Sequence, residues 1–184
     1  MSSQSPVSAS EFYFNVSNLD GDEAQGKMNY ISRDSEQEQA KGREQVPVHN
    51  RAGRPMSERE REQFIEHAES HDYCQCWQVS PPNGNDLSRD ELRKETRRVV
   101  DDYTRDKSTS RVAYAVHTDQ DGPNHTHVLV TGNERELRMD REDIEQTRTN
   151  AHERMTENER YRQRRREHGQ ENDRRRDLGG RRGR

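Results

Sequence analysis

The stretch that decides the fold is His117–Val130, which reads HTDQDGPNHTHVLV. The segments that flank its middle, Arg111–Val116 and Val128–Thr131, are rich in β-branched and apolar residues, a pattern typical of strands. Between them, Asp121–Asn124 has the composition of a turn. The sequence therefore predicts a β-hairpin with histidines on both arms, close to its tip.

Side-chain alternation along the two arms assigns these histidines to one face. His125 and His127 are two residues apart and point the same way, and His117 shares a face with Ala113 and Ala115. If the large apolar residues of both arms lie together, all three histidines lie on the opposite face. The large apolar residues are Val112, Tyr114, Val116, Val128 and Val130.

Three imidazoles converging on one point are suited to a divalent metal ion. Because Mg²⁺ prefers oxygen ligands, His117, His125 and His127 favour Mn²⁺ or another transition metal, with Mg²⁺ and Zn²⁺ as the other candidates. The alternative interpretation is a set of surface histidines beside a hairpin turn.

The composition limits the size of the core. Apolar residues make up 24% of the 184 residues, against about half in an average globular domain. We expect one domain over residues 11–150, a disordered tail over residues 1–10, and an Arg-rich tail over residues 151–184. No signal peptide or membrane-spanning run is recognisable, which favours a cytoplasmic protein.

The remaining elements predict an α+β fold. Strands are expected over 11–17 and 73–81, and helices from about residue 22 to 31, over 57–70, 87–105 and 140–155. Capping boxes mark two of these helices, Ser57 with Glu60 and Ser88 with Glu91. Residues 32–56 are expected to form a long loop. We predict a mainly antiparallel sheet with helices packed on one face and with the histidine face open.

The histidine pattern resembles that of the HUH relaxases, specifically the plasmid mobilisation relaxases of the MobA/MobL type. Their hallmark is a first histidine, a step of eight residues, and then His-x-His, which matches His117, His125 and His127. A second family motif, Tyr-Ile-x-Arg, appears as Tyr30-Ile31-Ser32-Arg33. The sequence departs from the family at Thr126, where an apolar residue is typical.

The resemblance implies a metal-dependent, site- and strand-specific DNA nicking and joining enzyme. In that reading the three histidines hold the metal, Tyr30 forms a 5′-phosphotyrosine, and Asp119 orients His117 or accepts the tyrosine proton. A turn-initiating role for Asp119 is equally compatible with its position. The implied partners are single-stranded DNA at a plasmid origin and accessory mobilisation proteins. The side chains expected to contact DNA are Arg33, Arg164, Arg165 and Arg166.

Two alternatives concern individual residues. Tyr161 follows the histidine hairpin, as the nucleophile does in rolling-circle replication initiators with HUH sites, so it is the second candidate nucleophile. A zinc site is conceivable from four residues near the second strand, although buried reduced thiols are the simpler reading of its cysteines. These residues are His67, His71, Cys74 and Cys76.

Three alternatives concern the function as a whole. The chain could be a rolling-circle replication initiator of the HUH class, or a metal-binding DNA-recognition module that does not cut. The third is a zinc hydrolase that uses the three histidines on a small substrate. Metal-dependent formation of a covalent protein–DNA adduct separates the nicking enzymes from the other classes.

Overall fold

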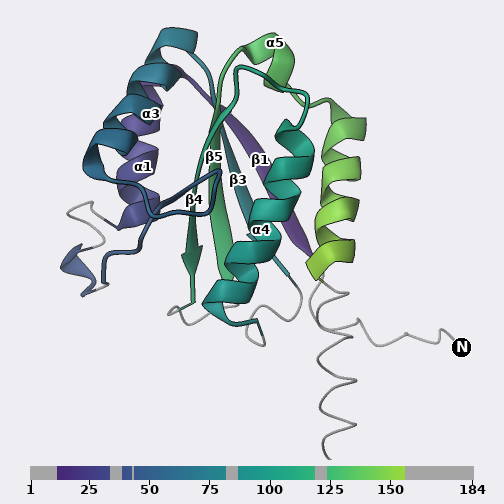
Figure 1. Ribbon diagram of the computed structural model, residues 1–184, viewed down its shortest axis with the longest axis horizontal. Helices are drawn as coiled ribbons and strands as arrows, with labels where there is room; N and C mark the ends of the chain where they lie inside the picture. The colour runs from purple at the N-terminus through teal and green to yellow at the C-terminus, as the bar shows by residue number, and fades with distance from the viewer. Residues whose placement is uncertain (1–11, 34–38, 43, 82–86, 119–123, 156–184) are drawn as a thin grey trace, which may run out of the picture.

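The computed structural model describes residues 12–33, 39–42, 44–81, 87–118 and 124–155. They form a five-stranded antiparallel sheet in the order β1-β3-β5-β4-β2 (Figure 1). The strands are β1 (Tyr13–Leu19), β2 (His49–Asn50), β3 (Cys74–Ser80), β4 (Arg111–His117) and β5 (His125–Thr131). The predicted α+β class with a mainly antiparallel sheet is confirmed, whereas the two predicted tails, 1–10 and nearly all of 151–184, lie outside the described residues.

β4 and β5 form the predicted hairpin. His117 lies opposite His125, and Ala115 lies opposite His127. Directly opposed residues in an antiparallel pair point to the same face, so this register places all three histidines on one side of the sheet. β5 is the central strand, with β3 on its other side.

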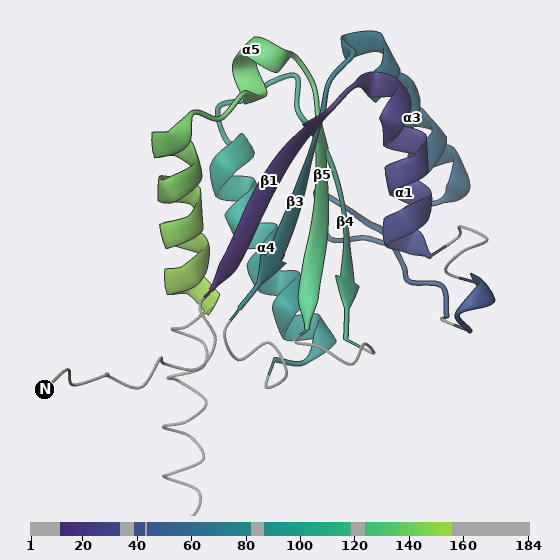
Figure 2. The ribbon, with the colours of Figure 1, turned by 180° about the vertical axis from the view of Figure 1, so that it is seen from behind.

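Helices cover both faces of the sheet, which corrects the prediction of one covered face (Figures 1 and 2). The face with the large apolar side chains packs against α4 (Arg89–Thr104) and a helix over 141–155. The histidine face packs against α1 (Ala24–Ser32) and α3 (Glu58–His71). The strand residues there are small enough for two helices to approach: Cys74, Cys76, Ala113, Ala115 and Leu129. The sequence predicted that the histidine face is open, and this prediction is wrong: two helices cover the face and the three histidines are buried.

Both predicted capping boxes form. Ser57 caps α3 and accepts a hydrogen bond from the Glu60 amide, while the Glu60 carboxylate accepts one from the Ser57 amide. Ser88 and Glu91 repeat this arrangement at the start of α4. Reciprocal capping of this kind satisfies amide groups that the first helical turn leaves without partners.

The long loop expected over 32–56 contains a short edge strand, β2, where His49 pairs with Tyr114. The helix predicted over 140–155 forms over 141–155, and Ala151 and Met155 are buried in the core over α4. The packed domain therefore extends beyond the expected boundary at residue 150.

A short helix and one turn of 3₁₀ helix complete the described elements. α5 (Glu134–Leu137) follows β5, and η1 (Gly21–Glu23) joins β1 to α1 and packs against α3. Among the helices that the structure describes, none is long and apolar enough to cross a membrane.

η1 leads directly into α1, so its close contact with α3 helps to position α1 and can be tested by mutation. A Cβ atom on Gly21 would lie 2.4 Å from the Ala68 carbonyl oxygen and 2.9 Å from the Glu69 Cα, both in the backbone of α3. We expect Gly21→Ala to lower the free energy of unfolding by about 1–3 kcal/mol, the usual effect of overpacking. The measurement is the urea midpoint of unfolding.

Gly26 in α1 is the matched control, since no atom lies within 4 Å of a Cβ placed there. Gly26→Ala should raise the free energy of unfolding by about 0.5–1 kcal/mol, because alanine is the better helix former. Equal effects of the two substitutions would contradict the close approach of η1 to α3.

Candidate metal centre

The three histidines of the hairpin form a compact cluster. The ring centroids of His117, His125 and His127 are 5.0–5.1 Å apart in all three pairs. One nitrogen from each ring can be chosen so that all three atoms lie within 4.8 Å of one another. A triangle of this size fits one divalent ion, so the predicted ligands converge as the hairpin register requires.

His127 carries the clearest sign that a group is to be bound here. Its side chain is buried, and neither ring nitrogen has a hydrogen-bond partner among the residues that the structure describes. Burial lowers the pKa of His127 to about 3, with smaller contributions from the neighbouring charges of His117, His125 and Lys27. The ring is therefore neutral at physiological pH, with a lone pair available to a metal ion.

A backbone carbonyl orients His117. Its Nε2 atom lies 2.8 Å from the Ile31 carbonyl oxygen, at the end of α1. A carbonyl oxygen only accepts, so Nε2 donates, and in the neutral ring the lone pair is on Nδ1. Metal-binding histidines commonly donate their other nitrogen to a carbonyl in this way. The residues present thus fit a divalent metal ion held by three imidazoles.

α1 also brings Tyr30 to the cluster from far upstream in the sequence. The Tyr30 ring contacts the His127 ring edge-on, with 5.5 Å between centroids, and is 42% exposed. Lys27, one helical turn earlier, places its Nζ atom 5.0 Å from the centroid of the Tyr30 ring. Sequence reasoning missed Lys27, although its spacing of three residues from Tyr30 on a predicted helix indicated a shared face.

A second exposed tyrosine lies on the same face of the sheet. Tyr13 is 49% exposed and pairs with Ser80, which is on the histidine side of β3 because Gln78 lies opposite His127. In the row of residues across the sheet, Tyr13 is two strands from His125. This distance is about 10 Å at the usual strand spacing. Tyr30 is in direct ring contact with His127, so of the two exposed tyrosines it is the better candidate for a nucleophile that acts beside the cluster.

Arg33 does not occupy a DNA-contacting surface. It ends α1 in the left-handed region, with φ of 61°, and it is fully buried. Its charge contributes to the lowered pKa of His127. The expected contact with nucleic acid is not compatible with this burial. Arg33 instead adds positive charge beside the cluster.

Four other predicted residues lie outside the described part of the chain. They are Asp119, Arg164, Arg165 and Arg166, and the alternative nucleophile Tyr161 lies outside it too. Their proposed roles remain predictions.

The alternative zinc site does not form among the described residues. His67 and His71 are close, with 4.5 Å between ring centroids, but they make no group of three or more ligands with Cys74 and Cys76. Both thiols are buried and free, and burial raises the pKa of Cys74 to about 12. The sequence favoured buried, reduced thiols over a zinc site, and the structure contains such thiols.

Thr126, the polar residue inside the His-x-His motif, points to the opposite face. Its hydroxyl lies 3.0 Å from that of Thr96 on α4, in a fully buried pair. A buried hydroxyl needs such a partner, so Thr96 explains how the motif tolerates threonine at this position.

Comparison of the chain with protein-family models and with curated proteins gives no match.

The fit to a metal ion predicts stabilisation of the fold by that ion. A ligand that binds the folded state alone at about 100 times its dissociation constant stabilises it by about 2.7 kcal/mol. We expect Mn²⁺, Ni²⁺ or Zn²⁺ to raise the melting temperature by roughly 5–10 °C, and His127→Leu to abolish the rise. His71→Gln is the control, and a loss of the rise in that variant would place the ion on α3 instead.

The unpartnered nitrogens of His127 predict an unusual effect on the metal-free protein. A buried polar group without a hydrogen bond costs about 1–3 kcal/mol. His127→Leu should therefore raise the free energy of unfolding in the presence of EDTA by about 1 kcal/mol while eliminating the response to metal. Chemical denaturation measures both. A marked loss of stability in EDTA would mean that the ring has a partner.

Proposed function

We propose that this protein is a metal-dependent, strand-specific DNA nicking and joining enzyme of the relaxase type. The single observation that carries the proposal is the contact between Tyr30 and the metal-binding cluster. The centroid of the exposed Tyr30 ring lies 5.5 Å from that of His127, one of the three buried histidines. These are the two components that phosphotyrosine chemistry on DNA requires, a nucleophile and a site for a divalent cation.

His117, His125 and His127 would hold the ion. When bound, such an ion neutralises charge on a non-bridging oxygen of the scissile phosphate. The protein supplies the orientation, since the Ile31 carbonyl fixes the His117 ring and burial keeps His127 neutral.

Tyr30 would attack the phosphorus atom through its phenolic oxygen. A bond forms between this oxygen and phosphorus while the bond from phosphorus to the 3′ oxygen breaks. The phenol loses its proton to solvent and the departing 3′ oxygen takes one up, which leaves a 5′-phosphotyrosine and a free 3′ hydroxyl. The exposure of Tyr30 suits a macromolecular substrate that must reach the nucleophile from solvent. Because the phosphotyrosine is itself an activated ester, the reverse reaction rejoins the strand.

Two cations near the nucleophile support this chemistry. Lys27 lies beside the Tyr30 ring, and Arg33 is close enough to His127 to influence its pKa. Positive charge at this point attracts an incoming phosphate and stabilises the negative charge that develops on it in the transition state.

The test is a covalent adduct between protein and DNA. The full chain is incubated with Mn²⁺ and labelled single-stranded oligonucleotides that tile the replicon encoding it, and adducts are resolved on a denaturing gel. We expect one strand to yield an adduct, and Tyr30→Phe to reduce its rate at least a hundredfold, or about 2.7 kcal/mol in activation free energy.

Tyr13→Phe is the matched control, because it removes the hydroxyl of the other exposed tyrosine on the same face. This variant should form adduct at the parental rate. Peptide mapping identifies the modified residue directly. An adduct on Tyr161 would transfer the nucleophile to the C-terminal segment, and metal-dependent binding without any adduct would favour a non-cutting DNA-binding module.

A further inference from the structure

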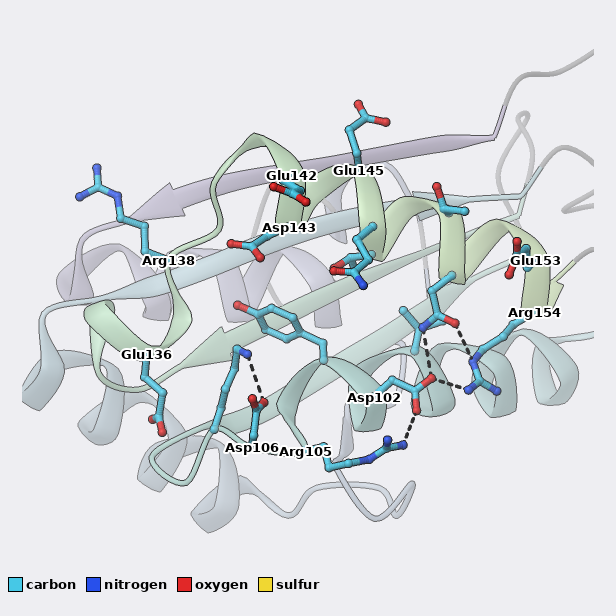
Figure 3. Close-up of a pocket in the computed structure, with 17 residues that line it drawn as sticks. Asp102, Arg105, Asp106, Glu136, Arg138, Glu142, Asp143, Glu145, Glu153 and Arg154 are labelled. Atoms are coloured by element: carbon cyan, nitrogen blue, oxygen red, sulfur yellow. Dashed lines mark hydrogen bonds and ion pairs between the residues drawn. The ribbon is translucent and has the colours of Figure 1, made fainter.

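α4 separates two surfaces of opposite charge. One of its flanks borders a cavity of about 940 Å³ between α4, α5 and the helix over 141–155 (Figure 3). Seven acidic and four basic side chains line this cavity. The other flank faces the turn after β2 and carries arginines at intervals of four residues: Arg89, Arg93 and Arg97. A polyanion is repelled by the first surface and attracted by the second.

Contacts hold each arginine of this row in place. Arg89 donates to the Thr118 hydroxyl at 3.1 Å, and Arg93 donates to the Gly53 carbonyl at 2.8 Å. The Arg97 side chain packs on Gly53, since a Cβ there would lie 3.3 Å from its Cδ atom. Gly53 has φ of 79°, which favours glycine. Arginines fixed in this way lose less entropy when they bind an anion.

The row keeps an excess of positive charge. Arg93 pairs with Asp90 at 3.4 Å, and Arg97 and Arg51 share Asp101 at 3.7 and 3.3 Å. With Arg89, this makes four arginines against two aspartates, an excess of two positive charges in a chain whose net charge is −4. Exposed ion pairs of this kind are weak, so an incoming phosphate can compete for the guanidinium groups.

Two buried polar atoms beneath the row have no hydrogen-bond partner among the described residues. They are the Tyr114 hydroxyl and His49 Nδ1, on stacked rings 5.6 Å apart. A Cβ on Gly53 would lie 3.6 Å from the Tyr114 hydroxyl and 3.5 Å from Arg97 Nη1, so both groups approach the same point. Because both atoms are buried, a phosphate would contact the Arg97 guanidinium group at the surface, and the Tyr114 hydroxyl would lie as a polar group beneath it.

The geometry points to the Arg89–Arg93–Arg97 row as a binding site for the phosphodiester backbone of DNA, which we call the track. This DNA is the substrate of the proposed nicking site, so the inference rests on the proposed function. The spacing of four residues puts successive guanidinium groups about 6 Å apart along the helix axis, which suits a chain with regularly repeated anions. The row begins at Thr118, directly after the metal ligand His117. DNA leaving the cluster at this end of the sheet therefore meets Arg89 first.

The test measures salt-dependent binding, without metal and therefore without cleavage. A fluorescein-labelled poly-dT oligonucleotide is titrated with the full chain in EDTA at several salt concentrations. Each phosphate contact to a single strand contributes about 0.7 to the slope of log K against log salt. The double variant Arg93→Gln, Arg97→Gln should lower the slope by about 1.4 relative to the parent and weaken binding roughly tenfold.

Two further variants control for net charge and for folding. Arg105→Gln with Arg138→Gln removes the same charge from the acidic cavity and should leave the slope unchanged. Arg93→Lys with Arg97→Lys retains the charge and should restore most of the slope, whereas a variant that had merely misfolded would show no such recovery.

Equal slopes in the two glutamine variants, or no change in either, would overturn the proposed track. So would competition by polyglutamate as effective as that by oligonucleotide, which would indicate an acidic protein partner. Failure of the track and failure of the nicking proposal remain distinguishable. If the parent forms the adduct but the Arg93→Gln, Arg97→Gln variant keeps the parental slope, only the proposed track is wrong. If the variant has a lowered slope but the parent forms no adduct, only the nicking proposal is wrong.

Discussion

The pairing of His117 with His125 at the end of the β4–β5 hairpin is the constraint on which the site depends. Side chains alternate along a strand, so this register alone decides that His127 joins the other two rings on one face. A slip of one residue between the strands would send histidines to opposite faces and expose apolar residues of the core. Burial of Val116 and Val128 against α4 therefore also maintains the geometry of the cluster.

α1 links the proposed nucleophile, Tyr30, to the candidate metal ligands. Its last turn supplies the carbonyl that orients His117 and the tyrosine ring that contacts His127. The same helix is buried at Ala24, Met28 and Ile31 against the sheet. Because one helix carries both contacts, a displacement of α1 would move the Ile31 carbonyl and the Tyr30 ring together.

Helices cover both faces of the sheet, and as a result the buried histidines and the charged side chains of α4 lie on opposite sides of it. α1 and α3 cover the histidine face, where burial keeps His127 neutral. α4 has an acidic flank towards the helix over 141–155 and a basic flank towards the turn after β2. Since the chain as a whole is acidic, attraction of a polyanion depends on where its arginines are placed. The fold places three of them in a row along α4, and the first, Arg89, donates to Thr118, which follows His117 in the chain.

The sequence by itself determined the hairpin, the common face of the three histidines and both capping boxes, because all of these follow from local spacing. The antiparallel α+β class followed from the order of the elements. Only the tertiary structure decided that α1 and α3 cover the histidine face, that Arg33 is buried beneath it, and that Lys27 lies beside Tyr30. Tyr30 and His127 are 97 residues apart in the chain, and no periodicity of local sequence encodes how a helix docks on a sheet. That docking depends on how the small residues Ala113 and Ala115 fit the surface of α1, which is a property of packed side chains in three dimensions.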